Sequence, residues 1–181
     1  MDLIKKEREF EKIKSFFEKL DFNEKQKGEK LVYDTEKGIF GTSDLDTVFE
    51  FLKKINPSPE DIFVDLGSGD GRINILASIF CKSIAIEFDK KLCKKSKKYS
   101  KTLGTTIEVF NQDYETFDFS KATIIYSYAD HFFTEEFIDK LKKEFTGKLY
   151  VYQGVFLPEN IKKGPKIWAK NTPLITYEFP Q

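Results

Sequence analysis

A short apolar strand that runs directly into a glycine-rich turn is the feature that most limits how this chain can fold. Residues 62–66 read Ile-Phe-Val-Asp-Leu, residues 67–71 read Gly-Ser-Gly-Asp-Gly, and a helical pattern follows. Glycines in such a turn allow positive φ angles and let a ligand touch bare backbone at the carboxyl edge of a sheet. The pattern predicts a nucleotide-type crevice, although glycines also serve simply to tighten a corner between strand and helix.

Beyond Pro59, short β-rich runs alternate with helical ones, which is typical of a parallel sheet flanked by helices. The predicted strands are Ile62–Leu66, Ser83–Phe88, Thr106–Phe110, Thr123–Tyr128, Lys148–Gln153 and Leu174–Phe179. The predicted helices between them are Arg72–Phe80, Lys90–Leu103 and Thr134–Phe145. The stretch from Pro158 to Pro165 is too short for a crossover helix, so we expect the last strands to pair antiparallel. The pattern indicates a doubly wound, mostly parallel α/β fold.

The N-terminal part reads as a helical extension over residues 1–37, ahead of a main domain over residues 38–181. Apolar residues recur at helical spacing from Asp2 to Leu20, and the polar stretch Asp21–Glu29 reads as a linker. A second helix is expected from Asp44, which can cap exposed amides, to Ile55. The first helix is expected either to pack over the crevice or to present a substrate.

Composition indicates one globular domain, because 181 residues with 40% hydrophobic content can bury a core. The 30 basic and 30 acidic residues cancel, which removes the global positive field of a general nucleic-acid binder. The lysine-rich helix Lys90–Lys101 remains either a solvated face or a docking surface for RNA or an acidic protein. Cys81 and Cys93 lack metal-ligand spacing, so we expect reduced thiols and no metal.

The N-terminus is too charged for a secretory signal, and no apolar run approaches the roughly 18 residues of a membrane helix. These features predict a cytoplasmic protein without membrane insertion.

Three acidic residues lie at or just beyond the ends of the first three predicted strands. They are Asp65, Glu87 and Asp113. Parallel strands end at one edge of a sheet, so these carboxylates are expected to converge on one ligand, although each alone could be a solvated strand end. Glu87 is placed to accept from both ribose hydroxyls, and Asp113 from an adenine amino group.

A site for a nicotinamide dinucleotide also has an acidic residue at about the position of Glu87. Its sequence fingerprint, however, requires Gly or Ala at the position that Arg72 occupies in this chain. Asp65 suits a ligand that carries an ammonium and a sulfonium better than one that carries a pyrophosphate. The charge pattern therefore favours S-adenosylmethionine.

The motifs at residues 64–72, 85–89 and 111–114 resemble the first three motifs of class I S-adenosylmethionine-dependent methyltransferases. Within them, residues 41–43 and 61–69 are similar to archaeal protein-lysine methyltransferases and the disruptor-of-telomeric-silencing histone enzymes. The resemblance covers roughly residues 38–181 and implies a Rossmann-like, seven-stranded methyltransferase fold. It implies donor contacts from Thr42, Asp65, Gly67, Ser68, Gly69, Glu87, Asp113 and Tyr114.

The acceptor side departs from that group after the fourth strand, where this chain reads Tyr-Ser-Tyr-Ala-Asp-His-Phe-Phe over residues 126–133. The Asn/Asp-Pro-Pro-aromatic turn of amino-methylating nucleic-acid enzymes is also missing there. Tyr126 and Tyr128 are candidates for an apolar channel that depresses the pKa of an acceptor lysine, or else are core residues. His131, the only histidine, is either a general base or a surface partner of Asp130.

The sequence thus predicts a methyltransferase, most simply a protein-lysine N-methyltransferase whose partner is a protein that presents a lysine. Two alternatives stay open. One is an RNA or small-molecule methyltransferase of the same fold, and the other is a non-catalytic S-adenosylmethionine-binding protein.

Overall fold

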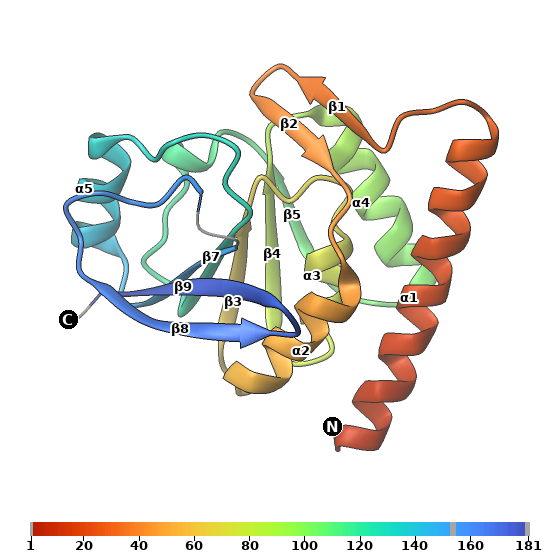
Figure 1. Cartoon of the computed structure of the whole chain (residues 1–181), viewed down its shortest axis with the longest axis horizontal. Coiled ribbons are helices and arrows are strands. Elements are labelled where there is room, and N and C mark those ends of the chain that lie inside the picture. Colours follow the sequence, from red (N-terminus) through yellow and green to blue (C-terminus); the bar gives the residue numbers. More distant parts are fainter. Residues whose placement is uncertain (1, 153–154, 180–181) are drawn as a thin grey trace.

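A seven-stranded sheet forms the centre of the computed structural model, which describes residues 2–152 and 155–179 (Figure 1). The strand order is β5-β4-β3-β6-β7-β9-β8. The strands are β3 (Ile62–Leu66), β4 (Lys82–Glu87), β5 (Glu108–Asn111), β6 (Ile124–Ser127), β7 (Gly147–Tyr152), β8 (Lys163–Ala169) and β9 (Thr172–Phe179). Neighbours from β5 to β7 are parallel, and β9 is antiparallel to β7 and β8. The predicted mostly parallel, seven-stranded α/β fold is confirmed.

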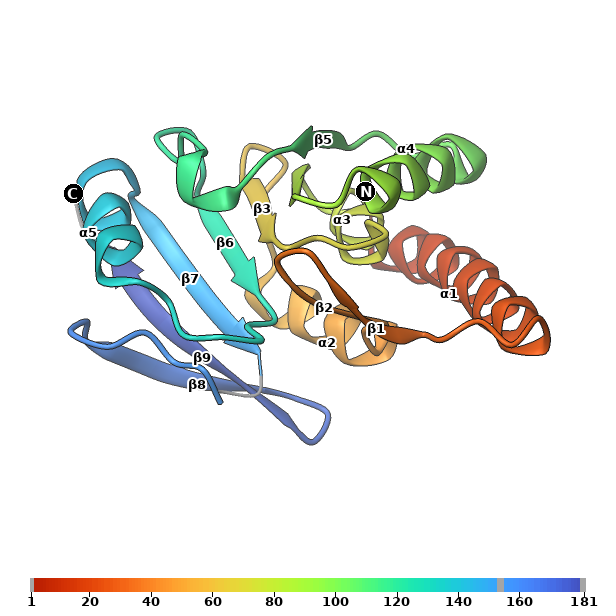
Figure 2. The same cartoon turned by 90° about the horizontal axis from the view of Figure 1, so that it is seen from above.

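Helices cover both faces of this sheet, and two buried cores lie on its opposite sides (Figure 2). The helices are α1 (Leu3–Gln26), α2 (Leu45–Ile55), α3 (Arg72–Ala77), α4 (Lys90–Leu103), the short 3-10 helix η1 (Tyr114–Thr116) and α5 (Glu135–Glu144). One core contains side chains of α1, α2 and α3, and the other contains side chains of α5. Within the described residues, no helix combines the length and apolar character needed to span a membrane.

Local capping explains why several helix ends agree closely with the prediction. The Asp89 carboxylate accepts from the N–H groups of Lys91 and Leu92 at the start of α4, and Gly104 ends the helix with φ of 70°. The Asp44 carboxylate caps α2, and the Thr134 hydroxyl caps α5. These are short-range interactions, so the sequence pattern alone could locate them.

Helix α1 is longer than the periodicity predicted, since it runs to Gln26 through most of the expected linker. The polar residues of this last part are held by tertiary ion pairs, from Asp21 to Arg72 and from Glu24 to Lys95. The expectation of a linker from residue 21 was therefore wrong for residues 21–26. Contacts with distant residues made the segment helical.

Three strands were not predicted from the sequence. Residues 32–41 form a hairpin of β1 (Val32–Thr35) and β2 (Gly38–Gly41), whose turn contains the expected domain boundary after residue 37. The segment Lys163–Ala169 forms β8, which agrees with the expected antiparallel end of the sheet but adds an edge strand to it.

Phe51 of α2 gives a direct test of the core between this helix and the sheet. Its side chain is 0% exposed and its ring contacts those of Tyr126 and Tyr150. Phe51→Ala should lower the free energy of unfolding by about 3–5 kcal/mol, because it leaves a cavity. Phe22→Ala on α1, where the ring is 60% exposed, should cost under about 0.5 kcal/mol. Equal losses in urea unfolding would contradict this assignment of the core.

Candidate functional site

A pocket of about 530 Å³ opens at the carboxyl ends of β3, β4 and β6. The chain passes from β3 to β4 on one side and returns to pair β6 on the other side of β3. Ligands in open α/β sheets bind at this kind of switch point, and the volume lies within the range of small-molecule sites. The fold therefore places a ligand-sized cavity beside the glycine-rich turn.

Backbone geometry ties the glycine-rich turn to two neighbouring elements. The Gly69 N–H donates to Glu87 Oε2 at 2.8 Å, and the Ser68 N–H donates to the carbonyl of Ile86. Gly69 has φ of 57°, and a Cβ there would lie 2.9 Å from the ring of Phe40 in β2. Only glycine fits this close approach, and the turn is thereby held between β2 and β4.

Asp65 is buried at the floor of the pocket with an unpaired oxygen. The residue is 2% exposed, and its Oδ2 has no hydrogen-bond partner among the described residues. Burial, with the negative charges of Glu87 and Asp70, raises its pKa well above the ordinary value. Such a group costs free energy unless a cation pairs with it, so the site fits a ligand with a positive centre. The ammonium of S-adenosylmethionine meets this requirement.

Glu87 is fixed by two backbone donors, one to each carboxylate oxygen. Its Oε1 accepts from the Asp89 N–H at 2.7 Å, and its Oε2 accepts from Gly69. Burial raises the pKa of Glu87 although these N–H groups act to lower it. Each oxygen keeps a lone pair for a further donor, which suits the paired hydroxyls of a ribose.

Most of the predicted site residues do line the pocket. These are Thr42, Asp65, Gly67, Ser68, Gly69, Glu87, Tyr114, Tyr128 and His131. The Ser68 hydroxyl is buried without a partner among the described residues, so it too can bind a ligand atom. The motif-based set thus comes together around one cavity, apart from two residues.

Asp113 is the first exception, because its carboxylate is used by the protein. It forms an ion pair with Lys37, and it caps η1 by accepting from the Glu115 N–H. Burial alone would raise the pKa of Asp113, but these two partners lower it below its ordinary value. Its neighbours Gln112 and Tyr114 line the pocket instead. The adenine role expected for Asp113 is therefore not supported by its position.

Tyr126 is the second exception, since it belongs to the core beneath the pocket. The residue is 0% exposed, and its ring packs against those of Phe51 and Phe63. Tyr126 of β6 is paired directly with Asp65 of β3, so both side chains lie on the same face of the sheet. The aromatic ring supports the site from below and does not reach an acceptor.

Both ring nitrogens of His131 have partners. Nδ1 lies 2.6 Å from Asp130 Oδ1, and Nε2 lies 3.0 Å from the Tyr114 hydroxyl. The imidazole is 54% exposed at the rim of the pocket. Neither ring nitrogen is therefore free to take a proton from a methyl acceptor, and this favours a role in orienting Tyr114 over a role as general base.

The β1–β2 hairpin is the part of the site that sequence reasoning missed. Lys37 pairs with Asp113, the Ile39 N–H donates to Asp130, and Phe40 packs on Gly69. The hairpin is thus attached to Gly69 and Asp130, which line the pocket, and to Asp113 beside it. Alternating β-rich residues around a turn that ends in glycine were the available signal.

Aromatic residues line the side of the pocket beyond β6 and β7. The rings of Tyr128 and Tyr152 lie 4.8 Å apart between centroids, and Phe156 also lines this side. Tyr128 is 50% exposed, so this wall is open to solvent. No group of three or more His, Cys, Asp or Glu side chains within residues 2–152 and 155–179 has the arrangement of a metal site.

Comparison with solved structures identifies the fold. The chain is similar to an RNA methyltransferase from Salinibacter ruber in complex with S-adenosyl-L-homocysteine, with 20% identity over 77% of this chain and 94% of that chain and a TM-score of 0.64. A putative methyltransferase from Escherichia coli (17% identity, 77% and 87% coverage, TM-score 0.58) and an S-adenosylmethionine-dependent methyltransferase from Aquifex aeolicus (15%, 72% and 88%, 0.55) share it. At these identities the likeness shows the fold alone.

No curated protein matches the sequence. Residues 11–146, however, match the family described as histone methylation protein DOT1. This match covers most of the chain, including the larger part of α1, the hairpin and the glycine-rich turn. The chain therefore belongs to the DOT1 family, a group of S-adenosylmethionine-dependent lysine methyltransferases.

Proposed function

We propose that this chain methylates the side-chain amine of a lysine presented by a protein. The observation that carries the proposal is the buried, unpaired carboxylate of Asp65 beside an aromatic wall open to solvent. The first feature suits a cationic donor, and the second suits the aliphatic stem of a lysine. S-adenosylmethionine supplies an activated methyl group on its sulfonium.

Donor binding is assigned to residues that surround the glycine-rich turn. Asp65 pairs with the ammonium, Glu87 accepts from the ribose hydroxyls, and Thr42 and Ser68 offer hydroxyls at the methionine end. Tyr114 lies against the adenine side, where His131 holds its hydroxyl. These contacts orient the donor, and the backbone of Gly67 and Gly69 permits its close approach.

The acceptor amine must be neutral to attack, whereas a lysine in water is protonated at neutral pH. Tyr128, Tyr152 and Phe156 provide an apolar wall that disfavours the ammonium form. The wall also aligns the amine in line with the donor and displaces its water, which is most of what this displacement requires. The proton leaves the amine to solvent at the open side of the pocket, because His131 is engaged by Asp130 and Tyr114.

The acceptor class can be tested with labelled S-adenosylmethionine and two defined substrates, a mixture of lysine-rich histones and total RNA. Label released as methyl-lysine after protein hydrolysis is the expected result. Label in RNA that is lost with nuclease would overturn the lysine assignment and favour the exposed lysines of α4 as an RNA-docking face. Donor binding without transfer to either substrate would contradict the proposed acceptor.

Asp65→Asn tests the donor assignment. The substitution removes the charge with little change of shape, so the Kd for S-adenosylmethionine measured by calorimetry should rise about a hundredfold. The donor-free variant should be more stable than the wild type by about 1–3 kcal/mol, because a buried unpaired carboxylate is lost. Asp34→Asn removes an exposed acid from β1 that does not line the pocket, and should change neither quantity.

The pH profile gives the same prediction a second readout. Because folding raises the pKa of Asp65, the contribution of this group to the stability of the donor-free protein is fully present below the ordinary carboxyl range and is lost as pH rises through the raised pKa. Donor affinity should increase over that same interval, as the carboxylate ionises. Asp65→Asn should make both profiles shallower, with Glu87 accounting for what remains. Unchanged profiles would contradict the assignment.

His131→Ala tests whether the imidazole is a base or an orienting group. If it orients Tyr114, kcat at saturating donor should stay within about twofold of the wild type, while the donor KM rises about three- to tenfold. Tyr114→Phe should give the same pattern, because it removes the other half of the hydrogen bond. A loss of kcat of about a hundredfold or more in His131→Ala alone would restore the role of general base.

A further inference from the structure

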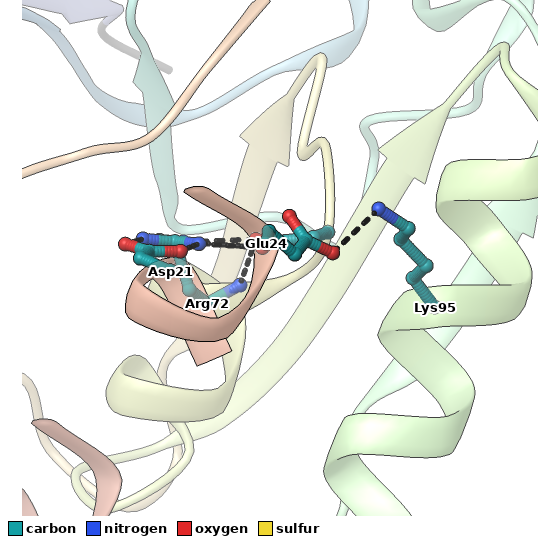
Figure 3. Close-up of polar contacts among 5 residues, drawn as sticks. Asp21, Glu24, Arg72 and Lys95 are labelled. Atoms are coloured by element: carbon teal, nitrogen blue, oxygen red, sulfur yellow. Dashed lines mark hydrogen bonds and ion pairs between the residues drawn. The ribbon is translucent and has the colours of Figure 1, made fainter. Parts of the chain in front are cut away.

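The C-terminal part of α1 makes a buried ionic contact with the start of α3, next to the glycine-rich turn (Figure 3). Asp21 Oδ1 and Oδ2 accept from Arg72 Nη2 and Nη1, each at 2.9 Å. The other edge of the guanidinium donates to Asp70 through Nε at 3.1 Å and Nη2 at 2.8 Å. Arg72 is therefore held between two carboxylates, one from α1 and one from the turn itself.

Burial makes this contact strongly dependent on both carboxylates. The side chains of Arg72 and Asp70 are 6% and 5% exposed, and that of Asp21 is 21% exposed. Burial alone would lower the pKa of Arg72, but the hydrogen bonds that it donates to Asp21 and the charge of Asp70 raise it above its ordinary value. The ring of Phe17 lies 4.7 Å from the guanidinium carbon and covers it further. Without Asp21, the two N–H groups of Nη1 and Nη2 that point at it would lose their partner.

The same contact reaches the pocket through Asp70 and Arg72, which both line it. Asp70 lies between Gly69, whose N–H donates to Glu87, and Gly71, whose N–H donates to the Ser68 carbonyl. Fixing the carboxylate of Asp70 therefore fixes the backbone that contacts the ligand. Because the guanidinium of Arg72 is bound by Asp70 and Asp21, it does not pair with Asp65. One oxygen of Asp65, without a partner among the described residues, is left for a cationic donor.

We propose that Asp21 is a positioning residue of the donor site, which acts through Arg72 and Asp70 on the glycine-rich turn. Helix α1 thereby becomes part of the donor-binding machinery, although Asp21 touches neither donor nor acceptor. This inference rests on the proposed donor site but is independent of which acceptor the enzyme uses.

Apolar contacts dock α1 independently of Asp21. The rings of Phe10 and Phe49 are stacked at 4.1 Å, and Phe10, Ile13 and Phe17 are each at most 5% exposed. A variant at position 21 should therefore keep the helix in place, and its effect on the donor can be read separately from its effect on folding.

Glu24 provides a matched control on the same helix. Its carboxylate pairs with Lys95 of α4 at 3.2 Å (Figure 3), and among the described residues no hydrogen bond or ion pair joins its side chain to the glycine-rich turn. Glu24→Gln thus removes one charge from a second ion pair of α1 while leaving Asp70 and Arg72 intact. Asp21→Asn removes the corresponding charge beside Arg72.

The experiment measures the Kd of S-adenosyl-L-homocysteine by calorimetry for the full chain. Asp21→Asn should raise the Kd about tenfold, Asp21→Glu should restore it to within about threefold of the wild type, and Glu24→Gln should leave it unchanged. In turnover, Asp21→Asn should raise the donor KM while kcat at saturating donor stays within about twofold. A purely structural role would lower thermal stability without this separation of KM from kcat.

Hydrogen exchange gives a reciprocal readout, because coupling between two sites acts in both directions. Donor binding should slow exchange of the amides in residues 17–26 of the wild type, and should do so less in Asp21→Asn. Equal Kd values for Asp21→Asn and Glu24→Gln, or equal increases in both, would overturn the proposal. A wild-type protein that does not bind S-adenosyl-L-homocysteine would overturn the donor site itself, and this inference with it.

Discussion

The site depends on the buried carboxylate of Asp65, one oxygen of which has no hydrogen-bond partner among the described residues. It lies near the end of β3, a central strand with parallel neighbours on both sides, and it is only 2% exposed. The nearby acids Glu87 and Asp70 increase the local negative potential. Keeping these groups together costs stability in the free protein, and a cationic donor offsets that cost when it binds. The preference for such a donor follows from charge and burial.

Asp65 stays without a cationic partner among the described residues because the nearby cations pair with other carboxylates. Arg72 is the buried cation beside the glycine-rich turn, and it is shared by Asp70 and Asp21. Lys37 is paired with Asp113 at the opposite side of the pocket. Both arrangements involve the first 41 residues, in α1 and in the hairpin, so the segment ahead of the central sheet contacts the residues of the proposed donor site.

Short-range patterns explain what could be predicted. Residues 62–66 form a strand because they are rich in β-forming residues, and the glycines that follow them form the turn. The two ends of α4 are set by residues adjacent to it in sequence, the capping carboxylate of Asp89 and Gly104. The end of α1 could not be found this way, because ion pairs with α3 and α4 hold its polar last turns. The hairpin likewise is stabilised by Asp113 and Asp130, which lie far along the chain.

The same distinction applies to the site. By itself the sequence determined the succession of strands and turns along the chain, and therefore that Asp65, Glu87 and the glycines meet at one edge of a parallel sheet, where it predicted a donor site. Only the tertiary structure decided where neighbouring side chains point: Asp113 turns to Lys37, Tyr126 enters the core, and His131 is held by its partners. The physical reason is that strand order places a backbone, whereas packing and competing charges choose what each side chain contacts.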